Sequence, residues 1–472
     1  MFLSIYVYRQ LGLTLDLTAD RPVLPQACIR EGPAFSRLTA EPDRLRDPGR
    51  LHHWLAAFLP ENATIVPYRQ HARRQRETHG VGSAHDSAAG ILWGNADVEY
   101  TGAIDFRQTD RDPPERLPER CPAAFEPLSE AAIGARLELA ARISDNAPRT
   151  RPAELLALSG RRASLSGMHG KCGIVRTADG RWAVPLGESL STWVCKHEHR
   201  AGLPGEAGVE AVCQRALALA GIPAALTTAR VFDGVQAVLS RRSDRVESPG
   251  RRVEPRHQEE WIQAACHPPD DKYDDGRGRG PQWPDAYHVL RERSPRPDAE
   301  TAVLTRILAC GAWMLGSGDM HRRNVGFLHT PAGDAPGVGL APLYDASSAA
   351  GTRYDKGAAV ALAGVMRPEG MKPVHWTRLS HACRIPPDDT VAILDDLFRT
   401  LPDALATAHE QARETDEVLS QAAVDLRVER VIRYVQGRER QYRQRQRGAA
   451  RKQRERAARG GDASGRPSAD GC

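Results

Sequence analysis

The chain has 472 residues, of which 41% are hydrophobic and 26% are charged, with a mild formal net charge of +5. This excludes full disorder and a minimal disulfide scaffold, and the length predicts two or three domains with at least one sizeable core. The nine cysteines are odd in number and form no CxxC pair, which fits a reducing cytoplasm without structural zinc.

No apolar run approaches the roughly 20 residues that cross a bilayer. The opening MFLSIYVYRQLGL lacks both a basic n-region and a small-residue cleavage site, which a secretory signal needs. We therefore expect a soluble, cytoplasmic protein that makes no contact with a membrane.

The first 127 residues hold one recognisable unit. Residues 1–45 show no sustained periodicity and remain unassigned. The run LHHWLAAFLPENATIV has helical spacing, and ILWGNADVEYTGAIDF predicts a short helix or strand pair that ends in an extended segment. We expect a small α+β subdomain over 46–127, closed by a linker near 108–128 that is rich in Pro and charge.

Residues 128–255 predict the order strand, strand, strand, helix, strand, strand. The helix is amphipathic and ends at a glycine, and both strand pairs flank turn residues. In chain order the segments are Lys171–Arg176, Trp182–Pro185, Ser191–Lys196, Glu206–Ala220, Ala229–Phe232 and Val235–Leu239.

Residues 256–436 predict a mainly helical region, because HQEEWIQAA, ETAVLTRILACGAWMLG and DTVAILDDLFRTL carry apolar residues at three-to-four spacing. Residues 325–345 interrupt it with two extended arms around a turn rich in Pro and Gly.

Residues 437–472 predict a basic, disordered tail. Its run from Arg438 to Arg459 has ten basic against two acidic residues, which favours a solvated helix or frayed tail first and a polyanion contact second.

The segment Gly318–Asn324, GDMHRRN, follows a predicted buried helix and places Asp319 five residues before Asn324. In phosphoryl-transfer loops this spacing lets the Asp accept the proton of the attacking hydroxyl while the Asn coordinates Mg²⁺. The spacing alone is common, so its weight comes from the hairpin that follows it.

The midpoint of the sequence between Asn324 and Asp345 is position 334.5, which lies inside the predicted turn. Antiparallel arms place equidistant residues side by side, so the two side chains are expected to offer an amide oxygen and a carboxylate to one hard cation. The alternative is that Asp345 caps the segment Ala346–Ala350.

Lys196 ends the third predicted strand, and Glu210 lies in the next helix. A strand lysine held by a helix carboxylate directs an ammonium at nucleotide phosphates in kinases. Glu206 shares the helix face and is a rival partner, and a surface lysine without a fixed partner is the other alternative.

The loop Ser164–Lys171, SLSGMHGK, places two glycines and two hydroxyls before a strand, where backbone N–H groups can hold phosphates. It matches neither a Walker A sequence nor the kinase glycine loop. Taken alone, it predicts an ordinary turn.

Seven motifs in order resemble those of HipA-type serine/threonine kinase toxins of bacterial type II toxin–antitoxin modules. They are SLSGMHGK, WVCK, VEAVCQRALALAGI, RRSDR, RHQEEWIQA, GDMHRRNVGFL and LAPLYDASS. The resemblance covers roughly residues 50–420, and FLPEN with GNADVEYTGAIDF is similar to the family's N-terminal subdomain. It implies a two-lobed, protein-kinase-like α+β fold with a mixed β N-lobe and a mainly helical C-lobe.

The resemblance also implies the site. Asp319 would be the catalytic base, Asn324 and Asp345 the Mg²⁺ ligands, Glu210 the partner of Lys196, and Ser164 the autophosphorylated serine that switches the kinase off. Ser166 is close enough to be confused with Ser164. The residues expected to bind ATP are Ser166, Gly167, Met168, His169, Gly170, Lys171, Lys196, Arg241, Ser243 and His321. For His321, a histidine satisfied by local backbone is an equal alternative.

Two positions depart from the family pattern. His169 stands where the loop usually has Gln, and RRSDR replaces E-R-F-D-R, so that Arg241 and Ser243 replace an acidic and an aromatic residue beside the adenine pocket. The second change predicts weaker nucleotide binding.

The expected function is therefore that of a Ser/Thr protein kinase toxin that uses ATP and Mg²⁺. Its expected partners are a helix-turn-helix antitoxin and a protein substrate, with an aminoacyl-tRNA synthetase as one candidate, and DNA contact through the antitoxin complex or the basic tail. The alternatives are a small-molecule phosphotransferase and a degenerate, non-catalytic scaffold that binds an antitoxin and DNA.

Overall fold

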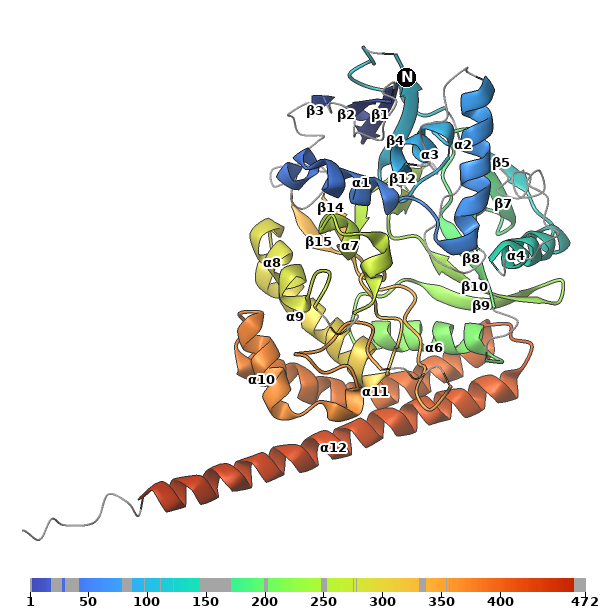
Figure 1. The fold of residues 1–472 in the computed structure, drawn as a ribbon. Helices are drawn as coiled ribbons and strands as arrows, with labels where there is room; N and C mark the ends of the chain where they lie inside the picture. Colours follow the sequence, from blue (N-terminus) through green and yellow to red (C-terminus); the bar gives the residue numbers. More distant parts are fainter. Residues whose placement is uncertain are drawn as a thin grey trace, which may run out of the picture.

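In the computed structural model, an N-terminal α+β unit lies at the top of Figure 1, the central sheet lies below it on the right, and the helical region lies on the left and at the bottom. A long C-terminal helix extends beyond them. None of the described helices is long and apolar enough to cross a lipid bilayer. The structure describes residues 2–17, 28–29, 42–78, 87–96, 98–110, 112–121, 123–144, 171–198, 203–247, 253–274, 276, 278–330, 337–353, 355 and 357–461.

The N-terminal unit is a four-stranded sheet in the order β3-β2-β1-β4, covered by helices. Its strands are β1 (Phe2–Val7), β2 (Gln10–Asp16), β3 (Cys28–Ile29) and β4 (Ile104–Thr109). Its helical segments are η2 (Pro42–Arg46), α1 (Pro48–Ala56), η3 (Asn62–Ile65), α2 (Val66–Thr78) and α3 (Ala88–Gly94).

The sequence left the opening strands unassigned. A two-residue turn at Tyr8 and Arg9 joins β1 to β2, and both residues have positive φ angles, 50° and 63°. Asn-Gly or Asp-Gly is the usual signal for such a turn, so Tyr-Arg conceals the hairpin. The other neighbour of β1 is β4, about a hundred residues later, which no local pattern can reveal.

The central sheet has six strands in the order β5-β7-β6-β8-β10-β9, and its antiparallel pairings confirm both predicted hairpins. The strands are β5 (Ala124–Pro127), β6 (Lys171–Arg176), β7 (Trp182–Leu186), β8 (Trp193–His197), β9 (Thr227–Phe232) and β10 (Val235–Arg241). The edge strand β5 lies within the residues predicted for the N-terminal unit. Next to the sheet, β11 (Arg245–Glu247) pairs with β12 (Val253–Pro255).

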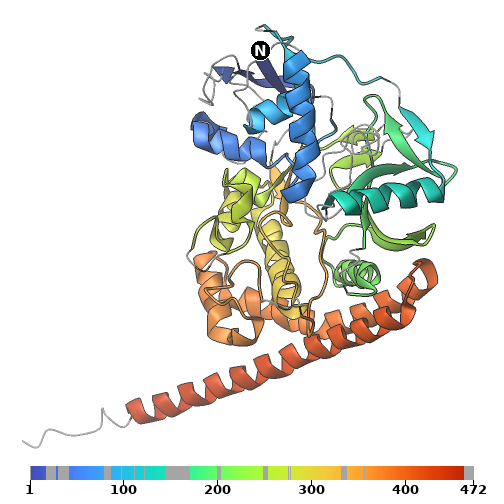
Figure 2. The same cartoon turned by 45° about the vertical axis from the view of Figure 1, so that its right-hand side comes forward.

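Two helices cover opposite faces of this sheet (Figure 2). Helix α4 (Glu130–Ser144) packs on the face that carries Cys195 and Leu239. Helix α6 (Glu206–Leu219) packs on the face of Val238, which is paired directly with Lys196. Because side chains alternate along a strand, this pairing turns Lys196 toward α6.

The helical region encloses the largest core of the molecule. It comprises α7 (Trp261–Ala264), η4 (Pro269–Lys272), α8 (Trp283–Arg293), α9 (Pro297–Ile307), the π-helix η5 (Leu308–Met314), η6 (Pro368–Gly370), α10 (Pro373–Ala382), α11 (Pro387–Thr415) and α12 (Gln421–Gly461). A three-stranded sheet of β13 (Gln258–Glu260), β14 (Gly326–His329) and β15 (Val338–Leu340) is inserted into it.

Two predictions need correction here. HQEEWIQAA is not one helix, because its first half pairs with β14 as strand β13 and only Trp261–Ala264 forms a helical turn. The predicted disorder is wrong for residues 437–461, which continue helix α12. Tyr442 on this helix is buried against Trp313 and Phe398, so apolar packing orders the start of the basic run. Residues 462–472 lie outside the described residues.

Candidate active site

One pocket lies between the central sheet and the helical region, and it gathers most of the predicted site residues. The described residues of the prediction that line it are Lys171, Lys196, Glu210, Arg241, Ser243, Asp319, His321, Asn324 and Asp345. These residues come from segments spread over 175 positions of the chain, from 171 to 345. The fold therefore brings together what the motifs suggested separately.

Lys196 lies between two carboxylates. Its Nζ donates to Glu210 Oε2 at 2.8 Å and to Asp345 Oδ1 at 3.3 Å. Although burial favours the neutral amine, the charges of Asp345 and Glu210 outweigh it and raise the pKa of Lys196. Burial also raises the pKa of Glu210, against the pull of the Lys196 ammonium. Of the two carboxylates considered from the sequence, Glu210 is the one that Lys196 contacts.

Asp345 is fixed by its backbone as well as by its charge. Its φ angle is +54°, in the left-handed region that non-glycine residues seldom adopt. The buried Gln214 of α6 supports this turn: with its amide oriented to satisfy both atoms, Oε1 accepts from the N–H of Asp345 at 2.9 Å and of Ala346 at 3.2 Å. Residues 346–350, all of which the structure describes, form no helix, so the alternative that Asp345 caps a helix there is wrong. Sequence reasoning missed Gln214.

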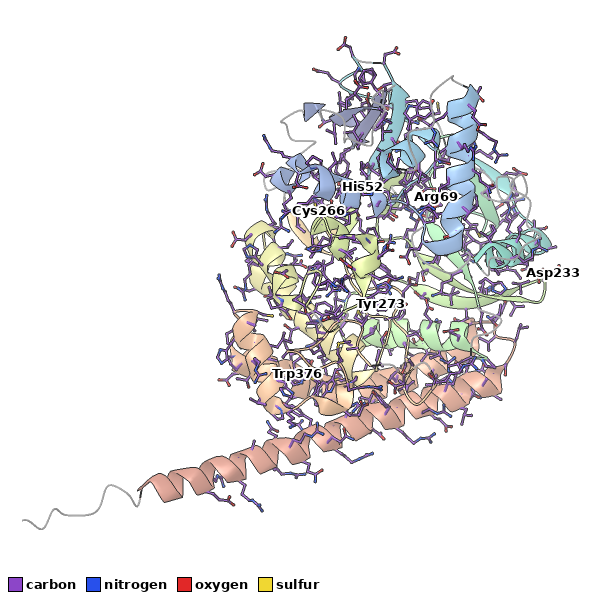
Figure 3. The ribbon with its side chains drawn as sticks, viewed as in Figure 1. His52, Arg69, Asp233, Cys266, Tyr273 and Trp376 are labelled. Atoms are coloured by element: carbon purple, nitrogen blue, oxygen red, sulfur yellow. The ribbon has the colours of Figure 1, made fainter. Side chains whose placement is uncertain are left out.

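Asp319 is presented by the turn after η5. Its Oδ1 accepts a 2.7 Å hydrogen bond from the hydroxyl of Tyr273, which lies near the centre of the molecule (Figure 3). Burial and the Asp319 charge raise the pKa of Tyr273, so it remains a donor. Asn324 Nδ2 donates to the Asp319 carbonyl at 2.7 Å. The sequence pattern contained no signal for Tyr273.

His321 has a local backbone partner and also lines the pocket. Its Nδ1 accepts from the N–H of Arg323 at 3.2 Å, and its ring lines the pocket. Burial lowers the pKa of His321, although Asp319 opposes this. The neutral imidazole then carries its proton on Nε2, which is 3.6 Å from Asp319 Oδ1.

The hairpin that links Asn324 to Asp345 is offset from the predicted register. Phe327 pairs with Leu340 and His329 pairs with Val338. If this register is continued, position 343 lies opposite Asn324, so Asp345 lies two residues beyond the position that was predicted for it. Both nevertheless reach the pocket, because the chain turns at Asp345 after the strand has ended.

The donor set fits a magnesium ion. The amide nitrogen of Asn324 is engaged by the Asp319 carbonyl, which leaves its oxygen as the acceptor. Asp345 adds a carboxylate that faces two ammonium groups, Lys196 at 3.3 Å and Lys171 at 3.6 Å. Amide and carboxylate oxygens are the ligands that Mg²⁺ prefers, and a site rich in lysine also suits phosphate oxygens.

Comparisons with known proteins show the family and the fold of this chain. The family model of the HipA-like C-terminal domain matches residues 163–405, just over half of the chain. The chain belongs to this family. A curated protein of Sinorhizobium fredii, "Putative kinase Y4mE", is 32% identical over 268 residues, which cover 56% of this chain and 58% of that protein. The match thus spans less than two thirds of this relative's length.

A solved structure of the toxin–antitoxin complex of HipA, HipB and operator DNA from Shewanella oneidensis MR-1 contains a chain with the same fold. The TM-score is 0.70 at 19% identity, and the match covers 93% of this chain and 97% of that one. The expected two-lobed, kinase-like α+β fold is therefore confirmed. As a HipA-like chain, the protein has a mixed β N-lobe and a mainly helical C-lobe.

Part of the predicted HipA-like nucleotide loop cannot be placed. Ser164, Ser166, Gly167, Met168, His169 and Gly170 lie outside the described residues. Lys171, which ends the loop, begins β6 and is paired directly with Lys196 of β8. The two lysines therefore stand side by side at the edge of the pocket.

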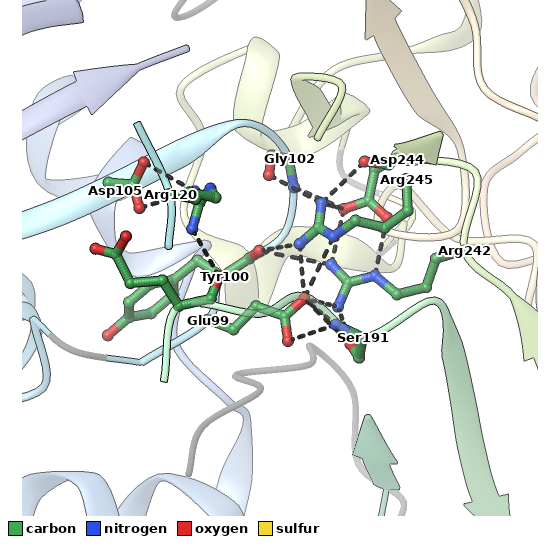
Figure 4. Close-up of polar contacts among 10 residues, drawn as sticks. Glu99, Tyr100, Gly102, Asp105, Arg120, Ser191, Arg242, Asp244 and Arg245 are labelled. Atoms are coloured by element: carbon green, nitrogen blue, oxygen red, sulfur yellow. Dashed lines mark hydrogen bonds and ion pairs between the residues drawn. The ribbon is translucent and has the colours of Figure 1, made fainter. Parts of the chain in front are cut away.

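The HipA-like motif RRSDR contributes to the pocket and to a buried ionic network. Its pocket-lining residues are Arg241, Arg242, Ser243 and Asp244. Arg242, Asp244 and Arg245 also form a buried ionic network with Glu99 of the N-terminal unit (Figure 4), in which Glu99 Oε1 lies 3.0 Å from each guanidinium. This network joins the N-terminal unit to the lobes.

Gly102 completes this network. Its N–H donates to Asp244 Oδ2 at 2.7 Å, and its φ angle is +83°. A Cβ at this position would lie 2.9 Å from the backbone nitrogen of Gln258, so only glycine fits without displacing the strand. Gly102 lies in the segment GNADVEYTGAIDF.

Proposed function

We propose that the protein is a serine/threonine protein kinase that uses ATP and Mg²⁺ and acts as the toxin of a toxin–antitoxin module. The observation that carries the proposal is the position of Lys196, held by Glu210 at 2.8 Å in the same pocket as Asp319, Asn324 and Asp345. A strand lysine, a helix glutamate and an Asp/Asn/Asp set are the parts that phosphoryl transfer requires.

In this proposal each side chain has one task. Asp319 accepts the proton of the attacking hydroxyl, and the hydrogen bond from Tyr273 orients its carboxylate. Lys196 and Lys171 hold phosphate oxygens, while Asn324 and Asp345 hold Mg²⁺, which neutralises developing negative charge when bound. Arg241 and Ser243 border the adenine, and His321 adjoins the nucleotide as a neutral donor.

The loop Ser166–Lys171 would cover ATP, and phosphorylation of Ser164 would inactivate the protein. This regulation rests on the family resemblance. It is supported by the position of Lys171, which anchors the end of the loop beside Asp345.

The proposed partners follow from the same family. The Shewanella complex contains HipB and operator DNA, which supports an antitoxin of the helix-turn-helix class and DNA contact through that complex for this chain. A protein substrate, with an aminoacyl-tRNA synthetase as one candidate, and a location in the cytoplasm belong to the same proposal. The division of the chain into units at 46–127, 128–255 and 256–436 belongs to the same proposal, except that strands β1 to β3 join the first unit and β5 joins the central sheet.

The test is phosphate transfer by the purified full chain. The protein is incubated with radiolabelled ATP and Mg²⁺, alone and with candidate synthetases. The variants tested beside it are Asp319→Asn and His409→Gln, a control at a residue that does not line the pocket. We expect labelled phosphoserine or phosphothreonine with the wild type and the control but not with Asp319→Asn. Transfer of phosphate only to small molecules would favour the alternative function, a small-molecule phosphotransferase. Absence of both transfer and ATP binding would overturn the proposal in favour of a scaffold.

A further inference from the structure

Three buried side chains meet on the face of the β13–β14 sheet that turns away from the active site. They are His257, which directly precedes β13, Glu259 within β13, and His329 on the neighbouring strand β14. Their relative exposures are 0%, 0% and 4%, and one potential ligand atom from each lies within 4.8 Å of the other two. Such a concentration of imidazole and carboxylate groups in a core calls for an explanation.

The strand register places these three side chains on one face. The N–H of His329 donates to the carbonyl of His257 at 2.9 Å, so the two histidines are cross-strand neighbours with ring centroids 4.8 Å apart. Glu259 points the same way as His257 because side chains alternate. The intervening Gln258 and the following Glu260 line the catalytic pocket. The cluster is therefore separate from the proposed magnesium site.

The N-terminal unit supplies groups that orient the cluster from outside. Trp54 Nε1 of α1 donates to Glu259 Oε1 at 2.7 Å. The Tyr8 hydroxyl accepts from the N–H of His257 at 3.0 Å and donates to the carbonyl of His329 at 3.2 Å. Carboxylates that bind metal are commonly hydrogen-bonded through their remaining atoms in this way, which fixes their orientation.

We propose that His257, Glu259 and His329 form a structural site for a divalent transition-metal ion, of which Zn²⁺ is the representative. Two imidazoles and a carboxylate are ligands that suit zinc and its neighbours rather than Mg²⁺ or Ca²⁺. The cysteine count, which predicted no structural zinc, carries no information about a site of this composition.

The geometry requires only small movements. Tetrahedral zinc with bonds of about 2.0–2.1 Å places its ligand atoms about 3.3 Å apart. His329 Nε2 and Glu259 Oε2 are 2.7 Å apart, so they separate by about half an ångström while His257 approaches. The proton shared between His329 and Glu259 leaves when the ion binds.

The site would stabilise the contact between the N-terminal unit and the strand that follows the catalytic loop. β14 begins two residues after Asn324, and Trp54 reaches the cluster from α1. Metal binding to the folded chain alone raises its stability by linkage. The competing explanation is a metal-free, buried hydrogen bond between Glu259 and His329.

The first experiment measures zinc in the tag-free full chain after treatment with a chelator, reloading with ZnCl₂ and desalting. His257→Gln and His329→Gln are compared with His409→Gln, which alters a histidine paired with Asp425 at 2.8 Å elsewhere, and with Asp345→Asn, which removes a carboxylate from the active site. We expect about one zinc per chain in the wild type and both controls, and loss of that zinc in the two cluster variants. Equal zinc in all five proteins, or none retained by the wild type, would overturn the site.

The second experiment does not depend on whether the variants fold. The wild type is titrated with Co²⁺, which should give the intense visible bands of four- or five-coordinate cobalt, and one equivalent of Zn²⁺ should remove them. Zn²⁺ should also raise the midpoint of thermal unfolding of the wild type but not that of His329→Gln. A weak six-coordinate cobalt spectrum, or an equal thermal shift in His329→Gln, would mean that the cluster is only a hydrogen-bonded pair.

Discussion

Glu61 of the N-terminal unit forms an ion pair with Arg323 of the catalytic loop, with a separation of 2.5 Å between Oε1 and Nη1. The same carboxylate contacts Lys272, and Arg323 also binds Glu260 through Nε at 2.6 Å. Burial would raise the pKa of Glu61, but Arg323 and Lys272 outweigh it and lower this pKa. The N-terminal unit therefore braces the loop that carries Asp319 and Asn324.

The first prediction concerns Asp319. We expect Asp319→Ala to lower phosphate transfer by about 100- to 10,000-fold, the usual contribution of a general base. ATP affinity should change little, because proton acceptance belongs to the transition state. Radiometric transfer assays and calorimetric titration with a non-hydrolysable ATP analogue measure the two quantities. Unchanged transfer would refute the role of Asp319.

The second prediction separates Glu210 from Glu206, which share a face of α6. Only Glu210 contacts Lys196, so Glu210→Gln should lower kcat/KM by about 10- to 100-fold, as expected for a hydrogen bond between charged groups. Glu206→Gln is the matched control and should behave as the wild type. Steady-state kinetics with Mg-ATP measures both variants, and an equal loss in the two would contradict the assignment.

The third prediction concerns the two proposed ligands of one ion. Asn324→Ala and Asp345→Ala should each weaken binding of Mn²⁺, used as a spectroscopic substitute for Mg²⁺, in the presence of nucleotide. In the double variant the total loss should differ from the sum of the single losses by about 0.5–3 kcal/mol, because the substitutions share a partner. Electron paramagnetic resonance measures the free Mn²⁺. Strict additivity would argue against a shared ion.

The fourth prediction concerns the stability of the buried network. Asp244→Asn should lower the free energy of unfolding at pH 7 by about 3–5 kcal/mol, because it leaves two buried guanidinium groups, Arg242 and Arg245, to share the single carboxylate of Glu99. Asp233→Asn, in an exposed hairpin turn, is the control and should change little. Urea unfolding followed by circular dichroism measures the difference.

The same network has a defined pH dependence. Burial would raise the pKa of Asp244, but Arg242 and Arg245 outweigh it and hold this pKa far below its ordinary value. A carboxyl with a lowered pKa in the folded state stabilises fully above the unfolded pKa of about 3.9 and loses that contribution as the pH falls. The difference in the free energy of unfolding between the wild type and Asp244→Asn should therefore become smaller below about pH 4. A constant difference from pH 7 to pH 3 would refute the explanation by the lowered pKa of Asp244.

The fifth prediction concerns Ser164. After incubation with Mg-ATP, mass spectrometry should find phosphate mainly on Ser164, and the modified protein should be inactive. Phosphorylation adds about −1.5 to −2 charges, which would lie near the bound triphosphate and oppose a closed loop, while Arg161 and Arg162 could hold the open one. Ser166→Ala is the control, because it leaves Ser164 intact. Phosphate found only elsewhere would refute the switch without affecting the kinase proposal.

Local patterns were sufficient for the central sheet and its helix. The turn residues at Asp179-Gly180 and Asp233-Gly234 lie between the paired strands, and the pairings of β6 with β7 and of β9 with β10 confirm both predicted hairpins. Each of these elements pairs with or packs against a neighbour that is close in the sequence. Periodicity and turn chemistry therefore contain most of the information about them.

The sequence by itself determined the fold class, the order of elements from 171 to 241 and nine of the residues that line the pocket. Only the tertiary structure decided that Glu210 rather than Glu206 holds Lys196, that Tyr273 and Gln214 orient Asp319 and Asp345, and that Glu99 and Glu61 join the N-terminal unit to the lobes. The physical reason is range. Helix and strand preferences act over a few residues, whereas these contacts join segments up to 262 residues apart and exist only once the cores have packed.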